Sequence, residues 1–308
     1  KMKISHLLFI SFLFYFTSII GQENPIELGK ITWLRNLEEA QKASKLKGLP
    51  IFILFQEIPG CSTCKNFGHN VMGHFLIKEL IETYFIPLAI YNNKSGYDAE
   101  VLKKFNETSW NNPVVHITNH EGKDILPKFH GQYSEGQMIT YIRKAMQANG
   151  KLIPKYLQLL EEEYTAQKSE LTLEMYCFWS GEKNIGSQDG VIYTEAGFSN
   201  GKEVVKVTYD KSKINAASII KNAKATGNAD AIHTNDPTLL SLAKQNNISV
   251  KKPNTYRKDN EVHYYLYHSK YHKLELTPMQ ATRINSALAQ GQSPEDYLSP
   301  RQIKLVKR

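Results

Sequence analysis

Hydrophobic positions between residues 32 and 148 repeat with two spacings that alternate along the chain. Continuous apolar runs are typical of strands buried on both faces, whereas apolar residues three or four positions apart indicate helices. Strands are predicted at 49–55, 85–91, 114–118 and 128–131. Helices are predicted from residue 60 through Phe67, Val71, Phe75 and Leu76, over 98–105, and from the capping residue Ser134 to 146. The alternation predicts an α/β domain.

The second half of the chain repeats this alternation after a break at residues 149–150. A charged stretch over 154–169 predicts a helical connector, and a new series of strands and helices begins at residue 170. We therefore expect a first domain over 22–150, a helical linker over 151–169, and a second domain over 170–308 that ends in a C-terminal extension.

A basic and then apolar segment opens the chain. Lys1 and Lys3 precede an apolar run over 7–20, which Gly21 and a polar stretch follow. This pattern is typical of a secretory signal peptide, here residues 1–21, and the run is short for a transmembrane helix. The alternative is an uncleaved anchor, which would be the only attachment to a membrane. In both cases we expect a secreted or periplasmic protein, in a compartment where thiols can be oxidised.

Composition excludes several classes of protein. The chain has 308 residues, of which 41% are hydrophobic and 22% charged, and these values exclude a disordered or collagen-like chain. A mean hydropathy of −0.42 excludes a protein with many membrane spans. The net charge of +8 would suit a nucleic-acid partner, but six basic residues lie at the two ends of the chain. The remainder is nearly neutral, so we expect no nucleic-acid binding.

Three cysteines are too few for a disulfide scaffold, and two of them, Cys61 and Cys64, form a CxxC pair. Because the pair lies between a predicted strand and a predicted helix, Cys61 would lie at a helix N-terminus, which favours a thiolate. Cys64 would lie one turn further on, partly buried, and could resolve the product of an attack by Cys61. A zinc site is the alternative, but no second pair completes one, and His69 or His74 would make a poor ligand set. We therefore expect no metal and no cofactor.

The segment around the CxxC pair resembles the thioredoxin fold over about residues 30–148. The resemblance rests on the apolar strand, the pair, the helix after it, and the later sequence WNNPVV at 110–115 with its following turn and strand. The sequence IPG at 58–60 is similar to a thioredoxin-like group with a VPGUxxT motif, in which selenocysteine takes the place of Cys61. In this family a cis-proline faces the CxxC pair. The resemblance therefore implies that the Asn112–Pro113 bond is cis and that Pro113 packs against Cys61 at the substrate site.

The third cysteine, Cys177, opens the sequence CFWSGE directly after a predicted strand at 171–176. Taken alone, this pattern favours a core cysteine, because free cysteine packs as a small hydrophobic residue. Together with later segments, however, it resembles peptide-methionine (S)-S-oxide reductase. The matching segments are a Gly-Val turn at 190–191, GFSNG at 197–201, EVVKVTYD at 203–210 and EVHYYL at 261–266, so that the resemblance spans about 170–268 with deletions.

This second resemblance implies an α+β domain of the ferredoxin-like, methionine sulfoxide reductase A type, with a defined set of roles. Cys177 would attack the sulfoxide sulfur, Phe178 and Trp179 would cup the S-methyl group, and Glu203 would protonate the sulfoxide oxygen. Phe198 stands where the family has a substrate-contacting tyrosine, and the loop before Glu203 is shortened. We expect Glu203 to lie close to Cys177, on a strand adjacent to it.

The two resemblances together imply an exported oxidoreductase that reduces methionine-S-sulfoxide in proteins through Cys177. The Cys61/Cys64 dithiol would recycle it through a Cys61–Cys177 mixed disulfide within one chain, which Cys64 resolves. The alternative is a thiol-disulfide oxidoreductase that acts on client disulfides, with a degenerate second domain that only binds clients or partners. The expected partners are oxidised or disulfide-bearing client proteins and an external thiol reductant.

Weaker patterns occur near the C-terminus. His263, His268 and His272 could bind a metal, but the last two are better interpreted as a solvated helix face. Tyrosines at 264, 265, 267 and 271 are interpreted as packing residues. Residues 298–302 are expected to form a surface element.

Overall fold

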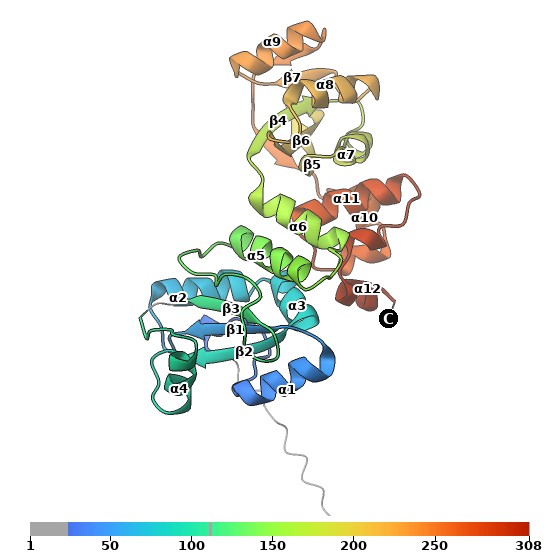
Figure 1. The fold of residues 1–308 in the computed structure, drawn as a ribbon. Helices are drawn as coiled ribbons and strands as arrows, with labels where there is room; N and C mark the ends of the chain where they lie inside the picture. Colours follow the sequence, from blue (N-terminus) through green and yellow to red (C-terminus); the bar gives the residue numbers. More distant parts are fainter. Residues whose placement is uncertain (1–23, 111–112, 308) are drawn as a thin grey trace, which may run out of the picture.

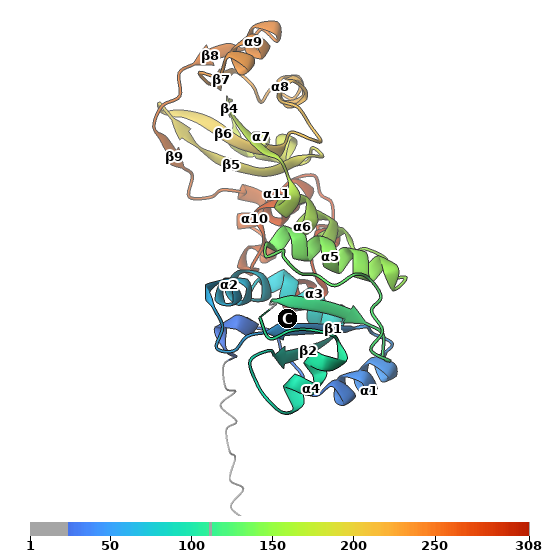
Figure 2. The same ribbon diagram turned by 60° about the vertical axis from the view of Figure 1, so that its left-hand side comes forward.

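The computed structural model describes residues 24–110 and 113–307. None of the helices in this part has the length and hydrophobicity that a membrane crossing needs. The predicted signal peptide falls outside the described residues. Figures 1 and 2 show two α/β bodies, one built on a three-stranded sheet and one on a six-stranded sheet, with helices α5, α6 and α11 between them.

The first body is organised by the sheet β2-β1-β3. The central strand β1 (Ile51–Gln56) is parallel to β2 (Ile86–Tyr91) and antiparallel to β3 (Val114–Thr118). Single bridges from Leu34 to β2 and from Phe129 to β3 extend the sheet on both sides. This strand order, with helices between β1 and β2, agrees with the thioredoxin-like fold that the sequence predicts for this part of the chain.

Every residue of β1 is buried because helices cover both faces of the sheet. Phe52 and Leu54 belong to the core formed with α3 (Phe75–Tyr84) and α5 (Glu135–Ala148). Their neighbours in β1 point the other way, since successive strand residues alternate between faces. That second core includes residues of α1 (Leu37–Lys47) and α4 (Tyr97–Lys104). The continuous apolar run in the sequence is therefore explained by burial of β1 on both faces of the sheet, as predicted.

Two local predictions for this body are wrong. The helix expected from residue 60 is divided into α2 (Ser62–Asn66), the π-helical turn η2 (Phe67–Met72) and α3. Gly68 in the turn lies so close to the backbone of residues 26–27 that a Cβ atom would be 2.1 Å from the carbonyl oxygen of Ile26. The strand expected at 128–131 is reduced to one bridging residue, Phe129, because Pro127 offers no N–H to continue the ladder.

The second body has the sheet order β8-β7-β4-β6-β5-β9. The strands of this sheet pair antiparallel, except β7 and β8, which are parallel, and the chain order β4-α7-β5-β6-α8-β7 is that of a split β-α-β unit. The central elements are β4 (Lys168–Glu174), α7 (Phe178–Gly186), β5 (Val191–Ser199), β6 (Lys202–Asp210), α8 (Ala216–Ala225) and β7 (Ala231–His233). The outer ones are α9 (Pro237–Gln245), β8 (Ser249–Lys251) and β9 (Tyr256–Lys258).

Helix α6 (Lys155–Thr165) and the C-terminal segment join the two bodies. α6 contacts α5 on one side and α11 (Pro278–Ala289) on the other, and α11 also packs on α7 and β5. The other elements of this segment are α10 (Tyr264–Tyr267), η3 (Lys270–Lys273), η4 (Glu295–Tyr297) and α12 (Pro300–Val306). The first turn of the chain, η1 (Ile26–Leu28), packs on η2.

The expectation that residues 298–302 form a surface element is wrong. Leu298, Ser299 and Gln302 are buried. The Ser299 hydroxyl donates to the Glu79 carboxylate of α3 at 2.6 Å, and the Arg301 N–H donates to the same carboxylate at 2.8 Å. The end of the chain is therefore bound to the first body.

Candidate redox sites

The first candidate site is the CxxC pair, which stands between β1 and α2. Cys61 is the N-cap of α2 and is exposed, whereas Cys64 lies in the first turn and is buried. Their sulfur atoms are 3.5 Å apart, in the reduced state. The two positions follow from one turn of helix, which brings residues three apart onto the same side.

The surroundings of the two sulfur atoms differ in their effect on ionisation. The backbone N–H of Cys64 at the helix start is the main cause that lowers the pKa of Cys61. Burial, with a smaller effect from the neighbouring Cys61 sulfur, raises the pKa of Cys64 to about 12. The exposed thiol is therefore the one that ionises first. Cys64 keeps its proton until it reacts.

The loop before Cys61 is held by buried groups. The Gly60 N–H donates to the buried Glu27 carboxylate at 2.8 Å, and the Gln56 amide donates to the carbonyl groups of Glu27 and Cys64. A Cβ atom on Gly60 would lie 2.6 Å from that of Cys64, so only glycine fits there. Sequence analysis did not find Glu27, because nothing in the local pattern relates it to residues 33 positions later.

A carboxylate oxygen of Glu57 and the two sulfur atoms lie within 4.8 Å of one another. Three such donors are one short of the four that structural zinc sites use. A cavity of about 610 Å³ adjoins Cys61 and is also lined by Trp110, whose side chain is 80% exposed. Pro113 is buried at the start of β3, and the Asn112–Pro113 bond lies outside the described residues.

The second candidate site lies at the start of α7. Cys177 is the N-cap of this helix and is half-buried. Like Cys61 it therefore stands at a helix start, which sequence analysis predicted for Cys61 but not for Cys177. The Glu203 carboxylate accepts the N–H of Phe178 at 2.8 Å, and the Glu203 carbonyl accepts the N–H of Met175 at 3.1 Å. Strand β6 pairs with β4, which ends just before Cys177, and this register carries Glu203 to the helix start.

Aromatic rings surround this helix start. The ring of Phe178 lies 5.2 Å from that of Phe198, which is paired with Glu203 across β5 and β6. The ring of Trp179 is stacked on Tyr264 at 3.9 Å. The structure therefore brings together the four residues that the sequence proposed, Cys177, Phe178, Trp179 and Glu203, and places Phe198 beside them. It adds Tyr264, which sequence analysis had assigned to packing alone.

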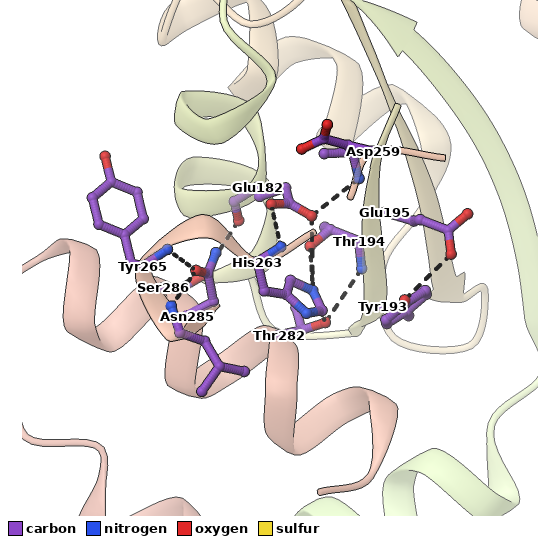
Figure 3. A network of polar contacts seen from close by, with 12 residues as sticks. Glu182, Tyr193, Thr194, Glu195, Asp259, His263, Tyr265, Thr282, Asn285 and Ser286 are labelled. Atoms are coloured by element: carbon purple, nitrogen blue, oxygen red, sulfur yellow. Dashed lines mark hydrogen bonds and ion pairs between the residues drawn. The ribbon is translucent and has the colours of Figure 1, made fainter. Parts of the chain in front are cut away.

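A buried polar network holds His263, the residue that precedes Tyr264 (Figure 3). The Glu182 carboxylate of α7 accepts the N–H groups of His263 at 2.8 Å and of Ala196 at 3.0 Å. The Nε2 atom of the His263 ring lies 3.4 Å from the Thr194 hydroxyl and 3.3 Å from the Thr282 hydroxyl. Burial raises the pKa of Glu182 to about 8 and lowers the pKa of His263 to about 4, so both groups are neutral near pH 7.

The histidine cluster expected as a possible metal site does not share one helix. His268 follows α10, whereas His272 belongs to η3, and His263 is buried in the network just described. The interpretation of His268 and His272 as one solvated helix face is therefore wrong. The break arises at Ser269, which caps η3 by accepting the Tyr271 N–H.

The two candidate sites lie in different bodies. Cys61 opens α2 and Cys177 opens α7, and Figures 1 and 2 show these helices separated by α5, α6 and α11 in both views. The expectation of a relay within one chain therefore finds no support in this arrangement.

No family model and no curated protein matches the chain. Solved structures that are similar to part of it include a DsbH oxidoreductase, with a TM-score of 0.33 and 17% identity, covering 42% of this chain and 92% of that one. Another is a thioredoxin from Thermus thermophilus, with a TM-score of 0.34 and 13% identity, covering 39% of this chain and 90% of that one.

Proposed function

We propose that this chain is a thiol-disulfide oxidoreductase in which Cys61 attacks and Cys64 resolves. The observation that supports this most is the asymmetry of the pair: an exposed sulfur with a lowered pKa lies 3.5 Å from a buried one with a raised pKa. The Cys61 thiolate attacks one sulfur of a client disulfide and releases the other as a thiolate. Cys64 then attacks the Cys61 sulfur, releases the second client thiolate and leaves a Cys61–Cys64 disulfide for an external thiol reductant.

Reduction of a disulfide-bonded client protein by cysteine variants tests this function. We expect Cys61→Ser to abolish turnover and Cys64→Ser to accumulate a mixed disulfide between Cys61 and the client, visible by mass spectrometry of non-reduced digests. Cys177→Ser is the matched control and should keep the wild-type rate. Alkylation at rising pH should label Cys61 before Cys64. Turnover by Cys61→Ser, or earlier labelling of Cys64, would contradict the proposal.

Cys177 is proposed as a second reaction centre, which reduces methionine-S-sulfoxide. A specific observation favours it: the Glu203 carboxylate accepts the N–H of Phe178, the residue that follows Cys177 at the start of α7. The rings of Phe178 and Phe198 pack against each other at the same place. The Cys177 sulfur attacks the sulfoxide sulfur while an acid protonates the sulfoxide oxygen, and this oxygen then passes to the Cys177 sulfur as its bond to the methionine sulfur breaks. The products are methionine and a sulfenic acid on Cys177, so the protein is oxidised as the substrate is reduced.

A peptide containing methionine-S-sulfoxide, with dithiothreitol as reductant, tests the second centre. We expect the wild type and the variant Cys61→Ser/Cys64→Ser to form methionine and Cys177→Ser to form none. The peptide with the R-sulfoxide is the matched substrate control and should not react. Binding of the S-sulfoxide peptide without any methionine product would instead support a domain that only recognises clients.

Recycling and location complete the proposal. Cys177 is the only cysteine after Cys64, so its sulfenic acid needs a thiol from elsewhere, which the Cys61/Cys64 dithiol can supply. The basic and apolar pattern of residues 1–21 supports export to a secreted or periplasmic location, where client disulfides and oxidised methionines occur.

A further inference from the structure

We propose that the Cys61/Cys64 dithiol of one copy of this chain reduces Cys177 of a second copy. The inference deepens the two reactions proposed above and rests on them. Its partner is another molecule of the same chain, which inserts the segment around Tyr176 and Cys177 into the cavity beside Cys61.

The two thiols lie far apart in the fold of one chain. Helices α2 and α7, which begin at Cys61 and Cys177, belong to bodies that α5, α6 and α11 keep apart (Figures 1 and 2). A tether raises the effective concentration of a partner only where the geometry allows both groups to meet. In this arrangement the linker gives Cys61 no such advantage toward its own Cys177.

Buried contacts hold the two bodies in this arrangement. The Glu79 carboxylate, in a residue only 5% exposed, accepts hydrogen bonds from Ser299 and Arg301. Between α5 and α6, Glu161 accepts from Thr140 at 2.9 Å and pairs with Arg143 at 2.6 Å. Rotation of one body against the other would leave the Glu79 carboxylate without these partners, which is costly for a buried charged group.

An exposed aromatic side chain lies beside each thiol. Trp110 lines the cavity of about 610 Å³ that adjoins Cys61 and is 80% exposed. Tyr176, which directly precedes Cys177, is 91% exposed. Exposed aromatic side chains of this kind commonly anchor protein interfaces. Because Tyr176 and Cys177 are adjacent in sequence, a tyrosine that enters the cavity brings the Cys177 sulfur to Cys61.

The reaction between the copies balances. The Cys61 thiolate of one copy attacks the Cys177 sulfenic sulfur of the other, forms a Cys61–Cys177 disulfide and releases water after protonation. Cys64 then attacks the Cys61 sulfur, which restores the Cys177 thiol and leaves a Cys61–Cys64 disulfide. The external thiol reductant reduces that disulfide.

Mixing two inactive full-length chains tests the proposal. Cys177→Ser supplies the dithiol and Cys61→Ser/Cys64→Ser supplies the sulfoxide site, with dithiol reductant too dilute to reduce Cys177 directly. We expect neither chain alone to turn over, the mixture to recover activity, and the wild-type rate per chain to rise in proportion to chain concentration. A wild-type rate per chain that is independent of concentration, with a mixture that stays inactive, would overturn the proposal in favour of a relay within one chain.

A second measurement separates this inference from the sulfoxide reaction itself. Cys177 in the Cys61→Ser/Cys64→Ser chain is converted to its thionitrobenzoate disulfide, and the Cys64→Ser/Cys177→Ser chain is added. We expect fast release of thionitrobenzoate and a covalent dimer, whether or not the sulfoxide peptide reacts. Trp110→Ala or Tyr176→Ala should slow this release at least about tenfold. Leu152→Ala is the matched control, because Leu152 lies between α5 and α6 and its side chain is 94% exposed. This variant should release thionitrobenzoate at the unchanged rate. Equal rates for all these variants would contradict the docking surface.

Discussion

The hydroxyl of Ser299 and the carboxylate of Glu79 form a 2.6 Å hydrogen bond between residues 220 positions apart. Because Glu79 lies in α3 of the first body and Ser299 caps α12, this contact attaches the end of the chain to the first body. The Glu79 carboxylate also accepts the Arg301 N–H, so it stabilises the start of α12 twice.

We predict that Ser299→Ala lowers the free energy of unfolding by about 1–3 kcal/mol, because it leaves one bond of a buried carboxylate unmade. The segment after residue 290 should then be cut faster by proteases, since its attachment to the first body is weakened. Urea unfolding and limited proteolysis measure the two effects. Lys307→Ala, which removes an exposed ion pair with Glu295 at 3.7 Å, is the control and should change neither.

The second prediction concerns the acid beside Cys177. Glu203→Gln should lower kcat for methionine-S-sulfoxide reduction by about 10²–10⁴-fold, the range typical for loss of a general acid. The glutamine oxygen can still accept the Phe178 N–H, so the melting temperature should change little. Glu195→Gln is the matched control in the same sheet, since Glu195 pairs with Lys258 at 2.8 Å instead. Unchanged kcat in Glu203→Gln would remove Glu203 from the reaction.

The third prediction concerns Gly60. A Cβ atom there would lie 2.5 Å from the Glu57 carbonyl oxygen, so Gly60→Ala must displace the backbone just before Cys61. We expect the pKa of Cys61 to rise, because the Cys64 N–H no longer points at its sulfur, and disulfide formation between Cys61 and Cys64 to slow. Alkylation rates across pH measure the first effect and oxidation by glutathione disulfide the second. Ser62→Ala, at an exposed position within the pair, should leave both unchanged.

The features that sequence analysis predicted correctly are set by neighbours in the chain. β1 is buried on both faces because residues 51–55 are all apolar, and α5 begins after Ser134 because that side chain and Gln137 form a capping box. The position of Cys61 at a helix start follows in the same way from a strand, a short loop and a helix in sequence. Such features need only a few adjacent residues to specify them.

The features that it missed depend on contacts between distant segments. The division of the helix expected from residue 60 results from close packing of Gly68 on residues 26–27, which no helical spacing can indicate. Tyr264 stacks on Trp179, and the N–H of the preceding His263 is bound by Glu182, 81 positions earlier. The buried tail likewise depends on Glu79. Each of these contacts joins segments that are distant in the sequence, so the pattern of neighbouring residues cannot predict it.

The last prediction concerns the pH dependence of stability that Glu182 introduces. Burial raises the pKa of Glu182 to about 8 from the ordinary carboxyl value of 4.5. Between these values the folded protein holds a proton that the unfolded chain has lost, so the free energy of unfolding falls as pH rises. His263 acts in the opposite sense, because its pKa is lowered to about 4 from 6.5 and its effect lies below pH 6.5. Between pH 6.5 and about 8, Glu182 therefore acts without His263.

We expect the melting temperature of the wild type to fall from pH 6.5 to pH 8 relative to that of Glu182→Gln, whose amide cannot ionise. Other titrating groups are common to both proteins and cancel in the difference. Because the Glu182 carboxyl accepts the His263 N–H, and Tyr264 follows His263, KM for the sulfoxide peptide should rise over the same interval in the wild type and not in Glu182→Gln. Glu195→Gln should follow the wild type in both measurements. A difference in melting temperature that stays constant from pH 6.5 to pH 8 would show that Glu182 does not titrate there.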